Sequence, residues 1–118
     1  MKKVIGMAVV LGVAFLSPLA VNEASASTYC GSAGYDVTRG GYEISYSGAR
    51  ASGMNCASVR YAMRFFRRRV RSQYSWPHMP RAFWDGYVTW HCHTGRGHSV
   101  RCAEYTTGTS YSFRAYVW

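Results

Sequence analysis

Residues 55–72 read NCASVRYAMRFFRRRVRS, and this stretch decides the fold that the sequence predicts. Asn55 is a favourable N-cap residue, because its side chain can accept a hydrogen bond from the first free backbone amides of a helix. The apolar residues that follow recur at helical spacing on one face: Val59, Ala62, Met63, Phe66 and Val70. We therefore predict a helix over residues 56–72 that is buried along this stripe, with Cys56 tying its first turn to a sheet.

Four segments outside the helix alternate in polarity, as half-buried strands do. They are residues 42–46, 87–92, 98–105 and 111–118. The sequence Gly95-Arg96-Gly97 predicts a hairpin turn, and Pro77 and Pro80 predict a loop over residues 76–80. Residues 27–41 are expected to form an irregular leader, and residues 47–53 a turn-rich connection. The predicted fold is α+β, with one helix packed on a small antiparallel sheet in the order β-α-β-β-β and stapled by disulfides.

The N-terminus has the three parts of a secretory signal peptide. Met1-Lys2-Lys3 is positive, an apolar run extends from Val4 to Leu16, and Ala24-Ser25-Ala26 is an A-x-A cleavage site. The alternative is a short retained membrane helix, but the run is shorter than the roughly 20 residues that span a bilayer. We predict a signal peptide at residues 1–26, a leader at 27–41 and an α+β domain at 42–118. The mature protein would be secreted, with no transmembrane segment.

All four cysteines, Cys30, Cys56, Cys92 and Cys102, fall after the predicted cleavage site. An even number in a short exported chain predicts two disulfides, the alternative being free or metal-binding thiols. The pairing stays open. Cys92 and Cys102 lie close on one predicted hairpin, whereas bonds from that hairpin back to Cys56 and Cys30 would tie the helix and the leader to the sheet. We expect the second pattern.

Several short segments together resemble a loose group of small secreted actinobacterial proteins. The segments are Cys30-Gly31, Gly53-Met54-Asn55-Cys56-Ala57, Trp90-His91-Cys92, Val100-Arg101-Cys102 and Tyr111-Ser112-Phe113. These proteins have a cysteine that opens a helix and two cysteines in a C-terminal hairpin, and the resemblance covers nearly all of the mature domain. It implies the fold and the compartment, and it assigns no functional residue.

The mature domain is strongly basic. The chain holds 14 Lys and Arg residues and 5 Asp and Glu residues. Lys2, Lys3 and Glu23 fall in the predicted signal peptide, which leaves twelve arginines against four carboxylates, a difference of +8. Because guanidinium groups stay charged at any biological pH, the domain is expected to bind an anionic wall polymer, phospholipid headgroups or nucleic acid. The alternative is compositional bias in a GC-rich genome.

Four arginines of the predicted helix form one ridge beside its apolar stripe: Arg60, Arg64, Arg67 and Arg71. Like charges at this spacing oppose helix formation by roughly 0.2–0.5 kcal/mol per pair. The domain has too few carboxylates to neutralise the ridge, so an external polyanion is expected to do so. The alternative is a solvated face whose guanidinium groups lie over aromatic rings.

The remaining candidates for chemistry are weaker. His91, His93 and His98 near one hairpin suggest a zinc or copper site, against the commoner case of exposed hairpin histidines. Trp76-Pro77-His78 and His93-Thr94-Gly95 faintly resemble the histidine-bearing segments of small secreted guanyl-specific ribonucleases. His78 and His93 with Arg101 could then supply the base, the acid and the cation, and Asp85 would be the only candidate for the carboxylate base. Trp76, Phe83 and Trp84 with Arg81 suggest a stacking platform or, alternatively, the closed end of the core.

We therefore predict a secreted, non-enzymatic, monomeric domain that binds an anionic polymer or surface of the cell envelope through the arginine ridge. We expect no catalytic residue, metal or cofactor. Two alternatives stay open. One is a cationic antimicrobial or inhibitor-type effector, and the other is a ribonuclease-like enzyme.

Overall fold

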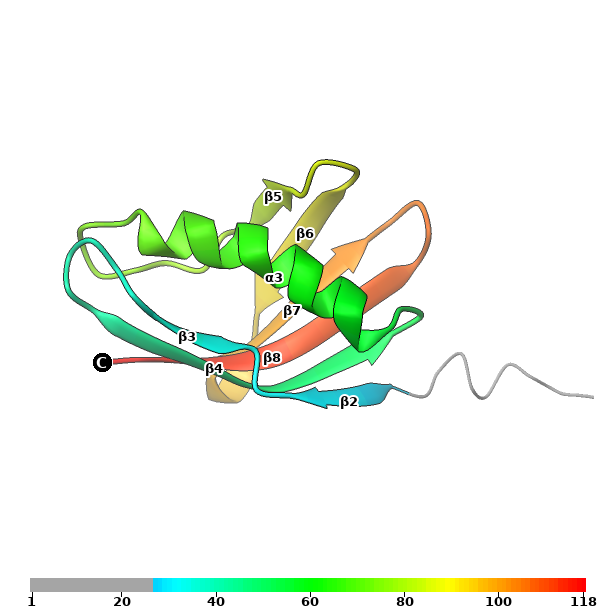
Figure 1. The fold of residues 1–118 in the computed structure, drawn as a ribbon, viewed down its shortest axis with the longest axis horizontal. Helices are drawn as coiled ribbons and strands as arrows, with labels where there is room; N and C mark the ends of the chain where they lie inside the picture. The colour runs from blue at the N-terminus through cyan, green and yellow to red at the C-terminus, as the bar shows by residue number, and fades with distance from the viewer. Residues whose placement is uncertain (1–26) are drawn as a thin grey trace, which may run out of the picture.

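The computed structural model describes residues 27–118, and it shows one helix with a seven-stranded antiparallel sheet (Figure 1). The predicted signal peptide, residues 1–26, lies outside the described residues. The elements in chain order are β2 (Thr28–Gly31), β3 (Gly34–Val37), β4 (Glu43–Ser52), α3 (Cys56–Arg71), β5 (Ala82–Trp84), β6 (Thr89–Thr94), β7 (Ser99–Glu104) and β8 (Thr109–Val117). A short 3-10 turn, Arg96–His98, joins β6 to β7.

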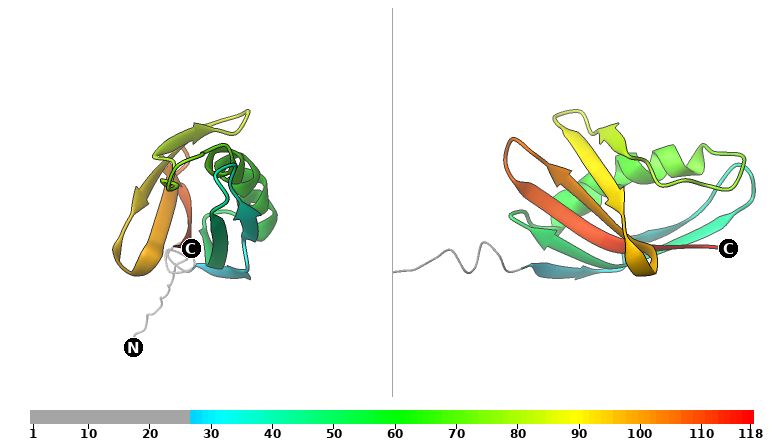
Figure 2. Two further views of the ribbon diagram at one scale, coloured as in Figure 1. Left: turned by 90° about the vertical axis from the view of Figure 1, so that its left-hand side faces the viewer. Right: turned by 180° about the vertical axis from the view of Figure 1, so that it is seen from behind.

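The long strand β4 organises the sheet. Both N-terminal strands pair with one edge of β4, β2 beside residues 49–51 and β3 beside residues 43–46. The last strand, β8, pairs with the other edge of β4 and is followed by β7, β6 and β5 in that order. The sheet curves, so that α3 contacts both β3 at one edge of the sheet and β5 at the opposite edge (Figure 2). The helix is thus held on one side of the sheet by strands far apart in sequence.

The predicted helix is confirmed, and it ends one residue earlier than expected. The Asn55 side chain accepts a hydrogen bond from the Ser58 amide at 2.8 Å, as an N-cap does. The helix buries the five apolar residues of the predicted stripe. Phe66 is fully buried and meets three rings edge-on, those of Tyr46, Phe83 and Phe113, with centroids 5.2–6.2 Å apart. Such aromatic contacts add to the burial energy of a small core.

The strand order is richer than predicted. Residues 27–41 are not an irregular leader, because they contain β2 and β3, so the domain begins before residue 42. These short edge strands lack a clear apolar alternation, so the sequence does not reveal them. They form by backbone pairing with β4. The observed order is therefore β-β-β-α-β-β-β-β, and the sheet dominates the α+β fold.

Two further strand predictions were wrong for local reasons. Residues 47–53 were expected to turn, but β4 continues to Ser52 through an irregularity between Ser47 and Arg50. Gly48 has φ +63° inside that irregularity, a conformation that favours glycine and typifies a bulge. The strand β5 was missed because it is three residues long and follows the proline loop.

The C-terminal strands and their hairpin are confirmed, with ends shifted by one or two residues. The side chains of Cys92 and Cys102 point to the core from β6 and β7, as the alternation predicted. Gly97 in the connecting turn has φ +63°, which explains the glycine at this position.

Two disulfides are present, but their pairing is not the expected one. Cys30 joins Cys56, and Cys92 joins Cys102. Cys92 and Cys102 are direct partners in the β6–β7 register, with their Cα atoms 4.0 Å apart. Once the hairpin forms, each of these cysteines therefore has the other as its neighbour for a disulfide. Cys30 on β2 ties the first turn of α3 to the sheet, as predicted for Cys56. Two disulfides fit a protein that is exported to an oxidising compartment.

Within residues 27–118, no helix is long and apolar enough to cross a membrane.

Candidate anion-binding surface

Asp36 on β3 decides what becomes of half the arginine ridge. Its carboxylate accepts two hydrogen bonds from Arg67, one from Nε and one from the guanidinium NH2 group, both at 2.9 Å. Arg71 donates a third at 3.1 Å. Arg67 also donates to the carbonyl of Tyr35 at 3.1 Å. These contacts join the C-terminal half of α3 to β3, so Arg67 and Arg71 help to dock the helix.

The ion pair is asymmetric in burial. The Asp36 side chain is 3% exposed, whereas those of Arg67 and Arg71 are 27% and 44% exposed. Burial alone would raise the pKa of Asp36, but the hydrogen bonds and charges of the two arginines outweigh it and hold the pKa below its ordinary value. Two guanidinium groups against one carboxylate leave this cluster with one net positive charge.

The other three carboxylates of the domain, Glu43, Asp85 and Glu104, accept hydrogen bonds that stabilise an edge strand and two loops. Glu43 accepts a hydrogen bond from the Tyr35 hydroxyl across β3 and β4. Asp85 accepts from the backbone amides of Tyr87 and Val88 and from the Trp90 indole, all within 2.9 Å. Burial raises the pKa of Asp85, but these hydrogen bonds outweigh it, so the pKa lies below its ordinary value.

Glu104 closes the turn between β7 and β8. It accepts hydrogen bonds from the backbone amides and the hydroxyls of Thr106 and Thr107. These bonds, the hydroxyl contacts above all, lower the pKa of Glu104 to about 2. The carboxylate therefore stays ionised and bound within its own turn, where it neutralises no arginine.

Most arginines of the domain consequently lack an ion-pair partner. Both ion pairs found among residues 27–118 involve Asp36. The ten arginines that make none in this part of the chain are Arg39, Arg50, Arg60, Arg64, Arg68, Arg69, Arg81, Arg96, Arg101 and Arg114. The excess charge predicted from composition is thus displayed on the surface of the fold.

The structure divides the arginine ridge into two halves. Arg60 and Arg64 are exposed and make no ion pair among the described residues, while Arg67 and Arg71 hold Asp36. The guanidinium of Arg64 lies 5.9 Å from the centre of the Tyr61 ring, as the alternative of cations over aromatic rings predicted. Arg68 lies in the same way 5.2 Å from the centre of Phe65. A guanidinium above an aromatic ring keeps the N–H groups at the rim of its own plane available, so it can still bind an anion.

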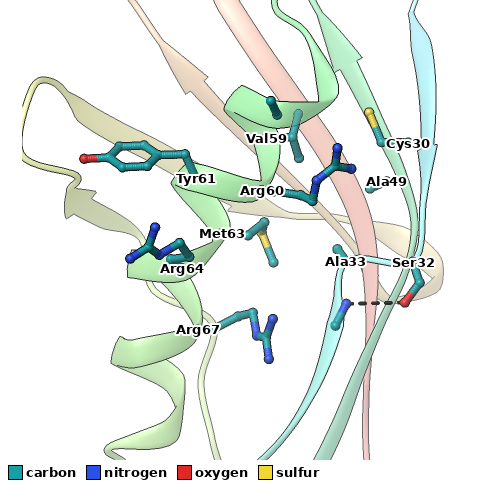
Figure 3. A pocket seen from close by; sticks show the side chains of 12 residues that line it. Cys30, Ser32, Ala33, Ala49, Val59, Arg60, Tyr61, Met63, Arg64 and Arg67 are labelled. Atoms are coloured by element: carbon teal, nitrogen blue, oxygen red, sulfur yellow. Dashed lines mark hydrogen bonds between the residues drawn. The ribbon is translucent and has the colours of Figure 1, made fainter.

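A groove of about 600 Å³ lies between the N-terminal half of α3 and the strands β2 and β3. Small or apolar residues form most of its walls: Cys30, Ala33, Gly34, Ala49, Ala57, Val59 and Met63. Arg60 and Arg67 extend from the helix toward the strands, whereas Arg64 points toward Tyr61 on the other side (Figure 3). The groove therefore combines an apolar floor with cationic edges, and no pattern in the sequence predicts it.

A second cationic surface covers the face of the sheet turned away from the helix. Arg50, Arg101 and Arg114 each lie between two buried neighbours on their strands, so their side chains point outward. The strand register aligns one row across this face: His93, Arg101, Ser112, Arg50 and Tyr29. Alternation on β7 and β8 could have revealed Arg101 and Arg114. Arg50 was hidden because its segment was expected to turn.

The three hairpin histidines do not converge. His91 stacks on Tyr105 with ring centroids 4.8 Å apart, and His98 packs against Tyr116 at 4.6 Å. Among the described residues, no group of three His, Cys, Asp or Glu side chains is placed to hold a metal ion.

The two histidines of the ribonuclease hypothesis do come together. His78 and His93 line one cavity of about 410 Å³ with Arg81, at the edge where the proline loop passes β6. Arg101 is the cross-strand partner of His93. Asp85 is absent from this cavity and is held by Trp90, so it does not fill the role of the carboxylate base.

The aromatic platform is divided between surface and core. Phe83 is buried, whereas Trp76 and Trp84 are exposed. Trp76 packs edge-on against Tyr42, with ring centroids 5.2 Å apart. Phe83 thus closes the core as the alternative predicted, and the two tryptophans do not form one surface with it.

No family model, curated protein or solved structure matches this chain. The resemblance to small secreted actinobacterial proteins therefore stays a prediction, as do the roles of antimicrobial and inhibitor.

Proposed function

We propose that this domain is a non-enzymatic binding module that attaches to an anionic polymer or surface of the cell envelope through the helix α3. The observation that carries this proposal is the distribution of charge on the helix. Its sixteen residues, Cys56–Arg71, include six arginines and no carboxylate. Only Arg67 and Arg71 meet an acid from elsewhere among residues 27–118.

Within the ridge, the proposal assigns polymer contact to Arg60 and Arg64 and support to Arg67 and Arg71. Arg60 and Arg64 are exposed, and neither forms an ion pair with a carboxylate of the described chain. Guanidinium groups bind phosphates and carboxylates through paired N–H donors. Binding would release counterions from the polymer, so affinity should fall steeply as salt rises.

The experiment measures binding of the oxidised domain to soluble poly(glycerol phosphate) over a series of salt concentrations. The test variant is Arg60→Gln with Arg64→Gln, because replacing Arg67 or Arg71 would also disturb Asp36. The matched control is Arg96→Gln with Arg81→Gln, which removes equal charge elsewhere. We expect the helix variant to lose at least tenfold in affinity and the control to lose much less. Equal losses of affinity in the two variants would show that binding depends only on the net charge of the domain. That result would overturn the assignment of polymer contact to the helix.

A second candidate function is favoured by one observation, the cavity that His78 and His93 share with Arg81. Two imidazoles beside a cation can supply the acid, the base and the phosphate contact of phosphodiester cleavage. Incubation of the purified domain with single-stranded RNA tests this. Cleavage that disappears in both His78→Ala and His93→Ala would support it, and intact RNA with the native domain would eliminate it.

A further inference from the structure

The groove beside the arginine ridge is fixed at both ends. At the start of α3, the disulfide Cys30–Cys56 joins the helix to β2, with the two Cα atoms 5.5 Å apart. Three turns further along, Arg67 is held by Asp36 on β3. The helix and the strands are therefore joined on either side of the groove, which hinders its closure by local collapse.

The groove exists because the residues between these two attachments are small. Ala33 and Gly34 on the strand side and Ala49 on β4 leave the space that larger side chains would fill. Glycine is favoured at position 34 for two further reasons: its φ of +127° is one that other residues rarely adopt, and a Cβ atom there would lie 2.4 Å from the Arg67 guanidinium. The glycine thus lets Arg67 lie against β3 and keeps the groove open.

The chemistry of the groove has two parts. Its floor is apolar, since Cys30, Ala33 and Ala57 are accessible and the buried core residues Val59, Met63 and Ala49 complete the lining. No Asp or Glu is among its lining residues. Its edge is cationic, because Arg60 extends from the helix toward the strands and the charge of Arg67 is only partly compensated by Asp36, which Arg71 shares (Figure 3). An apolar floor favours hydrocarbon, and an unpaired guanidinium favours an anion.

We infer that this groove binds a single-chain anionic lipid, with the acyl chain on the apolar floor and the phosphate head on Arg60. The inference rests on the proposed function and identifies the part of an anionic surface that the helix recognises. The volume lies within the range of about 300–1,000 Å³ that is usual for small-molecule sites. A polymer without a hydrocarbon chain would leave the floor empty, and a neutral lipid would leave Arg60 without a partner.

The test compares three probes below the micelle concentration: a monoacylglycerol phosphate, the uncharged monoacylglycerol with the same chain, and glycerol phosphate. Calorimetric or fluorescence titration of the oxidised domain gives the affinity for each. We expect the charged lipid to bind at least tenfold more tightly than either partial probe. Equal binding of the uncharged lipid or of glycerol phosphate would overturn the inference.

Two kinds of variant separate this inference from the proposed function. Ala33→Leu places a larger side chain in the groove and removes no charge, with Ala103→Leu on β7 as the matched control. We expect Ala33→Leu to lose at least fivefold in affinity for the charged lipid while binding poly(glycerol phosphate) as before. Undiminished lipid binding would overturn the inference and leave the proposed function standing.

The charge variants provide the other arm. Arg60→Gln is expected to weaken lipid binding at least threefold, and Arg69→Gln, an exposed arginine of the same helix that does not line the groove, much less. Equal effects of the two would count against the placement of the head on Arg60. If Ala33→Leu fails to form both disulfides, Ala57→Leu fills the helix side of the same groove and replaces it.

Discussion

The two halves of the arginine ridge have the same residue type and the same helical spacing, yet they do different work. Arg67 and Arg71 hold a buried carboxylate on β3, whereas Arg60 and Arg64 make no ion pair among the described residues. Asp36 alone creates this difference. A charge on a helix therefore acquires its role from what the opposing strand presents. The C-terminal half of the ridge supports the fold, and the N-terminal half, which makes no ion pair among the described residues, is where we propose that a ligand binds.

The largest expected effect comes from removing the covalent attachment beside the N-terminal half. Replacing Cys30 and Cys56 by alanine together should lower the free energy of unfolding by about 2–4 kcal/mol. It should also weaken lipid binding, because the groove loses one of its two fixed ends. Denaturant unfolding and lipid titration of this double variant check both effects. Unchanged lipid affinity in a folded variant would show that the disulfide does not maintain the groove.

The next effect sharpens the contrast between the halves directly. Asp36→Asn should lower the free energy of unfolding by about 1–3 kcal/mol, since it leaves two guanidinium groups without their partner. This is less than for a fully buried pair, because Arg71 is 44% exposed. Arg67→Gln should be destabilising in the same experiment. A loss in Arg60→Gln as large as that in Arg67→Gln would remove the distinction on which the comparison depends.

Acid should destabilise the fold through three carboxylates whose pKa is lowered by folding, of which only Asp36 belongs to the arginine ridge. The pKa of Asp36 and that of Asp85 lie below the ordinary 3.8, and the pKa of Glu104 is lowered from 4.5 to about 2. A carboxylate whose pKa is lowered by folding contributes stability that is fully present above the unfolded pKa and is lost as the pH falls through the folded one. We therefore expect Tm to be nearly constant from pH 7 to about pH 5 and to decrease steadily towards pH 2.

The thermal unfolding series is repeated with Asp36→Asn, which should flatten part of this decrease. A Tm that rises on acidification would contradict the ionised state assigned to the three carboxylates.

The smallest effect on stability should come from the free half of the ridge. Arg60→Gln with Arg64→Gln is expected to change the free energy of unfolding by no more than about 0.5 kcal/mol, with a small gain from relieved repulsion. In contrast, the plot of log affinity for poly(glycerol phosphate) against log salt should become shallower by about 1–2 units. A strong loss of stability in this variant would place both arginines in the supporting half.

The elements that could be predicted are those with a local signal. The stripe from Val59 to Val70 repeats at helical spacing, and β6 to β8 alternate around a glycine turn, so both were recognised without tertiary information. The strands β2, β3 and β5 have three or four residues each, which is too short for a periodic signal. They are ordered by pairing with neighbours, and single residues do not encode such pairing.

Of the candidate site, the sequence could predict only the excess of positive charge and the arginine ridge on the helix. Counting residues predicted an excess of arginine, and helical spacing predicted the ridge. The groove depends on Ala33, Gly34 and Ala49, small residues that carry no chemical signal of their own. The outward cations of the sheet depend on β4 continuing past residue 47, which a turn-like composition concealed.

The sequence by itself determined the helix and its buried face, the C-terminal hairpin, the presence of two disulfides and the permanent positive charge. Each of these follows from local periodicity or from composition, which a linear chain carries in full. Only the tertiary structure decided which cysteines pair, which arginines are neutralised and where a groove stays open. Those outcomes depend on distances between segments far apart in the chain, and above all on the strand that brings Asp36 to the helix.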